Sequence, residues 1–424
     1  MAVSTHASET RIADELYFSG HATLGAIYNT DDDVQYFRNL NQRRSDFNQF
    51  TYESDSRFGL RFSYRPHQKL GGEFQLFTRY GQSNEFETNV FSANLRYKPS
   101  ADWLFRAGVI PLENFYRADT IHIGYTYLWA RPPSEVYSFN LAASFKGISA
   151  QKRFYFGFDS LEVKAFGGYL GKLYSTHPDD QFNTRGSDIY GVTFEYYRGN
   201  SYISGGYTHL EISDDGLNTT KNNLFLGLTV DGTLDSDFIP LLRAALVDKP
   251  TFNYAFIGAG FEQGPWRLDA TLTATESGFI SFNDTYSGYF SAGYRYRRWT
   301  PFVQVAFSHN NPPSTAANSL TEFFLPPASV LNQLPPLERM IAEATAEGTG
   351  DFVSEQILQA AAEGQADQIT YTFGTRYDIN DSMSLKAQFS HTDSSEFPTY
   401  LWRNEAEDWD GNTNLISLVL DVTF

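Results

Sequence analysis

Apolar and polar residues alternate with a period of two along most of the chain. The C-terminal segment 412–424 shows the pattern most clearly, and it recurs in segments 57–65, 286–297 and 367–378. Successive side chains of a β-strand point to opposite sides of the sheet, so strict alternation predicts strands whose two faces meet different environments. The sequence is therefore predicted to be all-β. In the C-terminal segment the apolar face holds Ile416, Leu418, Leu420, Val422 and Phe424.

The polar face of these segments carries charge. Segment 57–65 places Arg57, Arg61 and Arg65 opposite Phe58 and Leu60. A soluble sandwich or barrel turns its apolar faces inward, and its interior cannot hold repeated arginines. A wet interior and an aromatic-rich exterior are typical of a transmembrane antiparallel β-barrel. We expect that fold, with a soluble β-sandwich as the alternative.

Short and long connections alternate between the predicted strands, as in bacterial barrels with short periplasmic turns and long outer loops. Tight turns are expected at 66–69, 99–102, 156–160, 198–201, 264–266, 298–300 and 380–381, and longer connections near 29–55, 82–86, 112–136, 173–186, 213–221, 248–252, 277–285, 310–366 and 394–411. Counting from a strand at about 16–28 gives 18 strands. The count falls to 16 if segment 223–247, which contains Pro240, does not form two strands. Either number leaves an aqueous lumen.

One composition shift interrupts an otherwise uniform chain. Residues 1–424 are expected to form a single barrel domain, and segment 311–366 is rich in Pro and Ala. Within it, 336–347 and 351–363 are predicted helices, so the segment is expected to be a long, partly helical outer loop. It could be a lid or partial plug, or have no role in transport.

Composition narrows the partners. The formal net charge of −18 argues against a nucleic-acid partner, which would need a basic surface. The mean hydropathy is −0.39, and no stretch has the 18 or more apolar residues that a spanning helix needs. A membrane protein of this composition would have to cross as a closed barrel. Cysteine is absent, which suits the cell envelope.

Inward positions of the second to fifth predicted strands carry five arginines. Neighbouring strands lie about 4.8 Å apart, so these side chains should form a basic stripe on one wall of the lumen. The third long connection begins directly afterwards and offers three acids. The predicted pore-constriction residues are Arg57, Arg61, Arg79, Arg96 and Arg106 on the wall and Glu113, Asp119 and Glu135 in the connection.

With these features the chain resembles the Gram-negative outer-membrane porin family. In that family the third outer loop folds into the barrel, and its acids face a ladder of arginines across a narrow eyelet. The terminal Phe424 resembles the family's outer-membrane assembly signal. The resemblance implies a bacterial outer-membrane location among lipid and lipopolysaccharide, a homotrimer, no cofactor and no enzymatic activity.

The predicted function is passive diffusion of small hydrophilic solutes. A channel selective for small anions such as carboxylates is the alternative, because charged walls tune selectivity. An outer-membrane enzyme and an adhesin or phage-docking barrel are alternatives of other classes. Ser390 and His391 are neighbours on a strand and point to opposite faces, so they cannot pair as nucleophile and base. The eight histidines lack the spacing of a zinc site. For the arginine stripe, the alternative role is only to solvate the inner wall.

Overall fold

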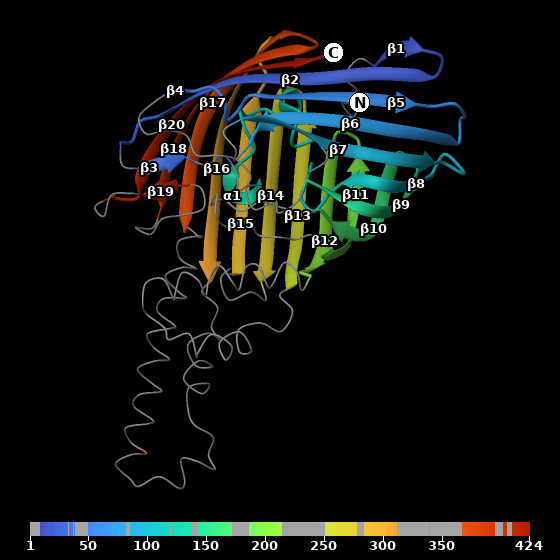
Figure 1. Ribbon diagram of the computed structural model, residues 1–424. Coiled ribbons are helices and arrows are strands. Elements are labelled where there is room, and N and C mark those ends of the chain that lie inside the picture. The colour runs from blue at the N-terminus through green and yellow to red at the C-terminus, as the bar shows by residue number, and fades with distance from the viewer. Residues whose placement is uncertain are drawn as a thin grey trace.

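The chain forms a closed ring of antiparallel strands in the computed structural model (Figure 1). The structure describes residues 9–32, 34–36, 38, 50–81, 85–118, 120–137, 143–171, 186–213, 251–277, 284–311, 339, 367–394, 402–404 and 409–424. Within these residues the ring contains β2 (Leu16–Asn29), β5 (Arg57–Tyr64), β6 (Leu70–Tyr80), β7 (Phe86–Tyr97), β8 (Trp103–Pro111), β9 (Ser144–Phe156), β10 (Asp159–Leu170), β11 (Asp188–Arg198), β12 (Ser201–Glu211), β13 (Thr251–Gln263), β14 (Trp266–Ser277), β15 (Asp284–Tyr294), β16 (Trp299–Asn311), β17 (Gln368–Asn380), β18 (Met383–Ser394) and β20 (Asn412–Thr423).

The described strands close the ring at 16, the lower of the two predicted counts. Strand β2 pairs with β5 on one side and with β20 on the other, which completes the circle. Strand β12 pairs directly with β13 along its whole length, so no further strand pair separates them in the wall. Segment 223–247, which the count of 18 required, lies outside the described residues.

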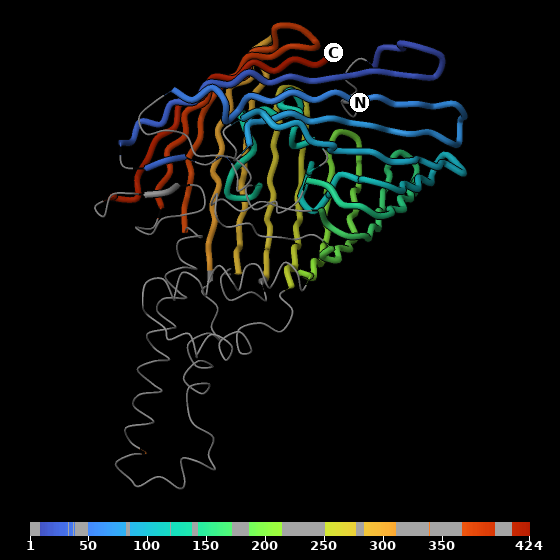
Figure 2. Tube along the Cα trace, viewed as in Figure 1, coloured from blue at the N-terminus to red at the C-terminus, as the bar shows by residue number. Residues whose placement is uncertain are grey.

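Four short strands accompany the ring. Strands β1 (Thr10–Ala13) and β4 (Phe50–Thr51) pair with β2, while β3 (Val34–Tyr36) and β19 (Trp402–Asn404) form a separate two-stranded sheet. The second sheet joins two connections that are far apart in the sequence (Figure 2). Its Val34 and Tyr36 pack with Ile27 of β2 and Leu415 of β20, which face into the ring.

All seven predicted tight turns join neighbouring strands of the ring. The residues between the strands are 65–69, 98–102, 157–158, 199–200, 264–265, 295–298 and 381–382. The two predicted helices within 311–366 lie outside the described residues, apart from Arg339. The single-domain organisation stays a prediction.

The burial pattern is the reverse of that in a soluble barrel. On β20, Ile416 and Leu418 are 47% and 51% exposed, whereas Ser417 and Asp421 between them are buried. On β17 the outward Tyr371 is exposed and the inward Thr372 is buried. The predicted outward apolar face and inward polar face are therefore confirmed. Within the described residues, no helix has the length and apolar character needed to cross a membrane.

In the connection between β8 and β9, the described residues 112–118 and 120–137 fold into the ring, and they are called the third loop below. It contains the short helices η1 (Gly124–Thr126) and α1 (Ser134–Tyr137). Its apolar side chains pack against inward-facing aromatic residues of the wall and bury a compact cluster inside the barrel. The predicted inward-folded loop is therefore present. Prominent members of the cluster are Leu112, Phe115, Tyr127, Trp129 and Tyr137 from the loop and Phe252, Tyr289 and Phe302 from the wall.

Candidate pore constriction

The five predicted arginines occupy inward positions of β5 to β8. Arg57 and Arg79 are directly opposite each other on β5 and β6, and Arg96 and Arg106 are opposite each other on β7 and β8. Arg61 lies on the same face of β5 as Arg57, four residues further along the strand. Strand parity thus places these side chains on one wall, called the basic wall below.

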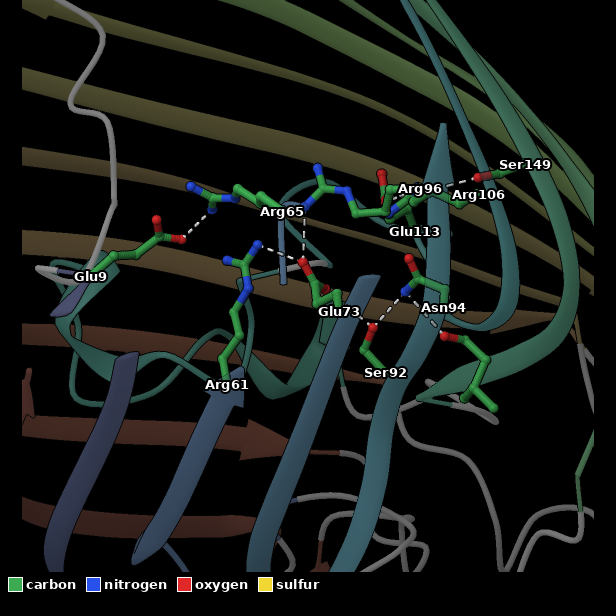
Figure 3. Close-up of polar contacts among 11 residues, drawn as sticks. Glu9, Arg61, Arg65, Glu73, Ser92, Asn94, Arg96, Arg106, Glu113 and Ser149 are labelled. Carbon is green, nitrogen blue, oxygen red and sulfur yellow. Dashed lines mark hydrogen bonds and ion pairs between the residues drawn. The ribbon is translucent and has the colours of Figure 1, made fainter. Parts of the chain in front are cut away.

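Glu73 neutralises part of the basic wall, and the sequence analysis missed it. Its Oε2 accepts hydrogen bonds from Arg61 Nη2 at 2.5 Å and from Arg96 Nη1 at 3.0 Å (Figure 3). Its Oε1 accepts one from Ser92 Oγ at 3.1 Å. Glu73 shares the inward register of β6 with Arg79, so the alternation that located the arginines also carried the signal for this carboxylate.

Glu113 holds the start of the third loop to the same wall. Arg106 Nη2 donates to Glu113 Oε1 at 3.1 Å, and Arg106 Nε donates to Ser149 Oγ at 3.0 Å (Figure 3). Lys164 on β10 contacts the other carboxylate oxygen of Glu113, Oε2. Burial alone would raise the pKa of Glu113, but the charges of Lys164 and Arg106 outweigh it and lower this pKa to about 2. Glu113 therefore remains a carboxylate at every physiological pH.

Arg57 and Arg79 differ from the other three arginines. Among the described residues, neither forms a direct ion pair, whereas the other arginines of the stripe each form one. Their nearest acids are Glu87, opposite Arg79 on β7, and Asp421, which Thr23 links to Arg57. Arg57 is 6% exposed, and its Nε donates to Thr23 Oγ1 at 3.4 Å. These two guanidiniums are therefore the members of the basic wall without a direct ion pair in the described structure.

The remaining two predicted acids do not join the stripe in the described structure. Glu135 lies in α1, is 5% exposed, and accepts a hydrogen bond from Gln368 Nε2 at 2.6 Å and another from the Thr370 hydroxyl. It thereby fastens the third loop to β17. Asp119 lies outside the described residues.

Inward cations of β14, β17 and β18 hold the middle of the third loop through its backbone. Lys386 Nζ donates to the Gly124 carbonyl at 2.7 Å. Arg376 Nη1 donates to the carbonyls of Tyr125 and Tyr127 at 2.7 and 2.9 Å, and Arg267 Nη2 donates to that of Thr126 at 3.4 Å. Four consecutive carbonyls are thus bound by three strands. Residues Arg267, Arg376 and Lys386 are called the clamp wall below.

The contact between Gly124 and the clamp wall leaves no room for a side chain. A Cβ at Gly124 would lie 1.9 Å from Asp421 Oδ1. Asp421 is fully buried, lies 2.9 Å from Lys386 Nζ and accepts a hydrogen bond from Thr23 Oγ1 at 2.7 Å. A buried carboxylate paired in this way ties the third loop to β2, β18 and β20 together.

A second buried carboxylate joins the third loop to the first outer connection. Asp55 is completely buried and accepts a hydrogen bond from Arg131 Nη2 at 2.8 Å, while Arg38 contacts its other oxygen. The Arg131 guanidinium also lies over the Tyr36 ring at 5.3 Å. Burial would raise the pKa of Asp55, but Arg131 and Arg38 lower it overall, so the carboxylate stays charged.

The third loop reaches the basic wall again at His122. Its ring lies 4.3 Å from that of Phe77 on β6 and 5.0 Å from that of Phe91 on β7, measured between centroids. Burial and the nearby charges of Arg79 and Arg57 lower the pKa of His122 well below its usual value. A neutral imidazole therefore docks beside the two arginines of the basic wall that form no direct ion pair in the described structure.

The chemistry of the described lumen is that of charge and hydrogen bonding. Ser390 and His391 bond to different neighbours: Ser390 Oγ lies 2.9 Å from Thr372 Oγ1, and His391 Nδ1 lies 2.9 Å from Asn414 Oδ1. In the described part of the chain, no group of three or more acidic or histidine side chains could hold a metal ion.

Comparison with known proteins gives similarity of fold. No protein-family model and no curated protein sequence matches the chain. Among solved structures, an anion-selective porin from Comamonas acidovorans has a TM-score of 0.52 at 12% identity, covering 96% of this chain and 99% of that one. The outer-membrane channel DcaP of Acinetobacter baumannii has a TM-score of 0.51 at 10% identity, covering 98% and 99%. The trimer form of OmpT, an outer membrane protein of Vibrio cholerae, has a TM-score of 0.50 at 12% identity, covering 96% and 99%.

Proposed function

We propose that this chain is an outer-membrane porin through which small hydrophilic solutes diffuse. The observation that carries the proposal is the third loop, which is folded inside a closed barrel with polar inner walls and bound to those walls from several sides. Exposed aromatic and aliphatic side chains cover the outer face, as a barrel in a bilayer requires. The third loop narrows the lumen, and the walls that remain set the preference for charge.

Anion preference is the finer form of the proposal. Arg57 and Arg79 form no direct ion pair in the described structure, although Glu87 lies opposite Arg79. Two carboxylates serve four other cations: Glu73 serves Arg61 and Arg96, and Glu113 serves Arg106 and Lys164 of β10. A wall with surplus positive charge raises the local concentration of anions. Small anions such as carboxylates are therefore the favoured solutes. One structural neighbour is an anion-selective porin, which supports testing this chain for anion selectivity.

An enzymatic role is not part of the proposal. A barrel hydrolase needs a nucleophile within hydrogen-bond reach of a base. Ser390 faces inward and is buried, while His391 follows it on the other face of β18, so the one adjacent serine and histidine that the sequence analysis weighed cannot act together.

A homotrimer formed through the barrel walls is proposed, with close contact at small outward residues of β2. Gly20, Ala22 and Ala26 lie on the outward register of β2, but a Cβ at Gly20 would meet the Phe424 ring at 2.5 Å. The terminal ring therefore already covers Gly20, and Ala22 and Ala26 are the small residues left for close contact with a second copy. One structural neighbour is described in a trimer form.

Planar-bilayer recording of the purified chain tests the proposal. A porin should give long-lived conductance steps that grow in proportion to salt concentration. A silent bilayer with correctly folded protein would contradict the proposal and favour an adhesin-type barrel. Mass measurement in mild detergent tests the trimer separately, because a monomer would remove only that part.

A further inference from the structure

The turn between β15 and β16 differs from three neighbouring turns at the same end of the barrel. The turns β9–β10, β11–β12 and β13–β14 each have two residues and begin with a glycine in the left-handed region, Gly157, Gly199 and Gly264, with φ of 66°, 58° and 58°. A Cβ at any of them would meet nothing within 4 Å. Tight hairpins need positive φ at this position, so these glycines serve backbone conformation alone.

Arg297 occupies the corresponding position between β15 and β16. Tyr296 N donates to Trp299 O at 2.7 Å, and Trp299 N donates to Tyr296 O at 3.0 Å, so only two residues turn the chain. Arg297 has a φ of 58°. An arginine is strained in this region, and such strain is often kept at positions whose side chain has a function. The Arg297 side chain is therefore a candidate for a role that glycine could not fill.

The turn also gathers positive charge without acidic partners. Arg295, Arg297 and Arg298 are all exposed. Among the described residues none of the three has an ion-pair partner: Arg298 Nη1 donates to the Ile379 carbonyl at 3.4 Å, and the Arg297 guanidinium lies over the Tyr296 ring at 5.4 Å. Arg295 continues the inward register of Ser291 and Gly293, so Arg297 and Arg298 are the two guanidiniums of the turn left available to an anion outside the barrel.

Large exposed aromatic side chains flank the turn on the outward face. Trp266 is 52% exposed and packs edge-on against Tyr294 with 4.9 Å between ring centroids. Trp299 is 49% exposed, and its ring lies 4.6 Å from that of Tyr377. Tyr and Trp collect where the apolar core of a bilayer meets the headgroups. The turn therefore lies at headgroup depth if the barrel spans a membrane.

We infer that Arg297 and Arg298 bind the phosphate of an anionic phospholipid in the leaflet at the short-turn end of the barrel. Guanidinium groups form paired, charge-assisted hydrogen bonds with phosphate oxygens. Trp266 and Trp299 would contact the glycerol and upper acyl region of the same lipid. The inference rests on the proposed porin function, because it requires the barrel to lie in a bilayer.

Native mass spectrometry with added phosphatidylglycerol tests the site. The wild type should retain phosphatidylglycerol in preference to phosphatidylcholine. Arg297→Gln, which removes the charge but keeps the non-glycine position, should lower the retained lipid at least threefold, and Arg297→Gly should lower it equally while relieving the strain. Arg198→Gln is the matched control, because Arg198 lies at the same end beside a turn that begins with Gly199. It should leave retention unchanged.

Two further measurements distinguish a lipid headgroup from a free phosphate ion, and the lipid site from the proposed pore. Inorganic phosphate at millimolar concentration should not displace the lipid, and displacement would show a free-anion site instead. Equal phosphatidylglycerol retention in wild type and the Arg297 variants would overturn the inference. Conductance is recorded on the same preparations: if the wild type gives no pore, the porin proposal fails, whatever the lipid result.

Discussion

The basic wall and the clamp wall carry the same kinds of residue on the same face of the barrel, yet those residues have different contacts. On β5 to β8, Arg57 and Arg79 form no direct ion pair in the described structure. On β14, β17 and β18, the cations donate to backbone carbonyls of the third loop. An inward cation can therefore set the electric field of the lumen or hold the third loop that narrows it. Which of these two roles a cation has depends on whether the third loop passes beside it.

The largest effect is expected where the clamp wall is broken at its buried ion pair. Lys386→Met removes the ammonium from a fully buried Asp421 and from the Gly124 carbonyl. An unpaired buried carboxylate should lower the free energy of unfolding by about 3–5 kcal/mol. Urea unfolding in detergent measures the change. The double variant Lys386→Met/Asp421→Asn should recover part of it, and a single variant as stable as wild type would show that the pair contributes little.

A smaller effect is expected from acid on the contact between the third loop and the basic wall. His122 has a lowered pKa in the folded protein, so below about pH 6.5 the unfolded chain binds a proton that the folded one does not. The contribution of His122 to the free energy of unfolding is therefore fully present above about pH 6.5. Below that pH it falls by about 1.4 kcal/mol per pH unit, until the pH reaches the pKa of His122 in the folded protein.

The variant His122→Phe should keep the aromatic contacts with Phe77 and Phe91 and lose this pH dependence. Unfolding free energies at pH 7, 6 and 5 give the two slopes. The histidines other than His21 contribute equally to both proteins. His21 is electrostatically coupled to His122, so the difference in slope reports His122 together with this coupling. Identical slopes in wild type and variant would contradict a neutral, buried imidazole at this position.

The sequence predicted the wall of this barrel far better than its interior loop. Alternation places Arg57 inward and Phe58 outward because a strand has only two faces, and turn chemistry located all seven short connections. The same alternation places Glu73 inward on β6, so the position of this carboxylate also follows from the sequence. The contacts of Glu135 with Gln368 and of Arg131 with Asp55 had no such signal, because they depend on how the loop crosses the lumen and no local period determines that path.

The smallest predicted effect concerns the compensated part of the basic wall. Glu73→Gln would leave Arg61 and Arg96 without their shared carboxylate. One unit charge about 10 Å from a passing ion in water is worth about 0.4 kcal/mol, with opposite sign for an anion and for a cation. The two shifts add to about 0.8 kcal/mol, so the anion-to-cation permeability ratio should rise roughly fourfold. Asp14→Asn is the control, because Asp14 is a fully exposed carboxylate outside the ring. A ratio unchanged by Glu73→Gln would show that solutes do not pass near Arg61 and Arg96.

The reversal potential of the open pore in a salt gradient tests most directly the claim that the basic wall sets selectivity. The wild type should prefer anions weakly despite a net charge of −18, because the field is strongest where the lumen is narrow. The double variant Arg57→Ala/Arg79→Ala should lose that preference, and Arg106→Ala should change it less because Lys164 still holds Glu113. Arg198→Ala, outside the lumen, should leave it unchanged. A strong cation preference that is the same in wild type and double variant would contradict the account.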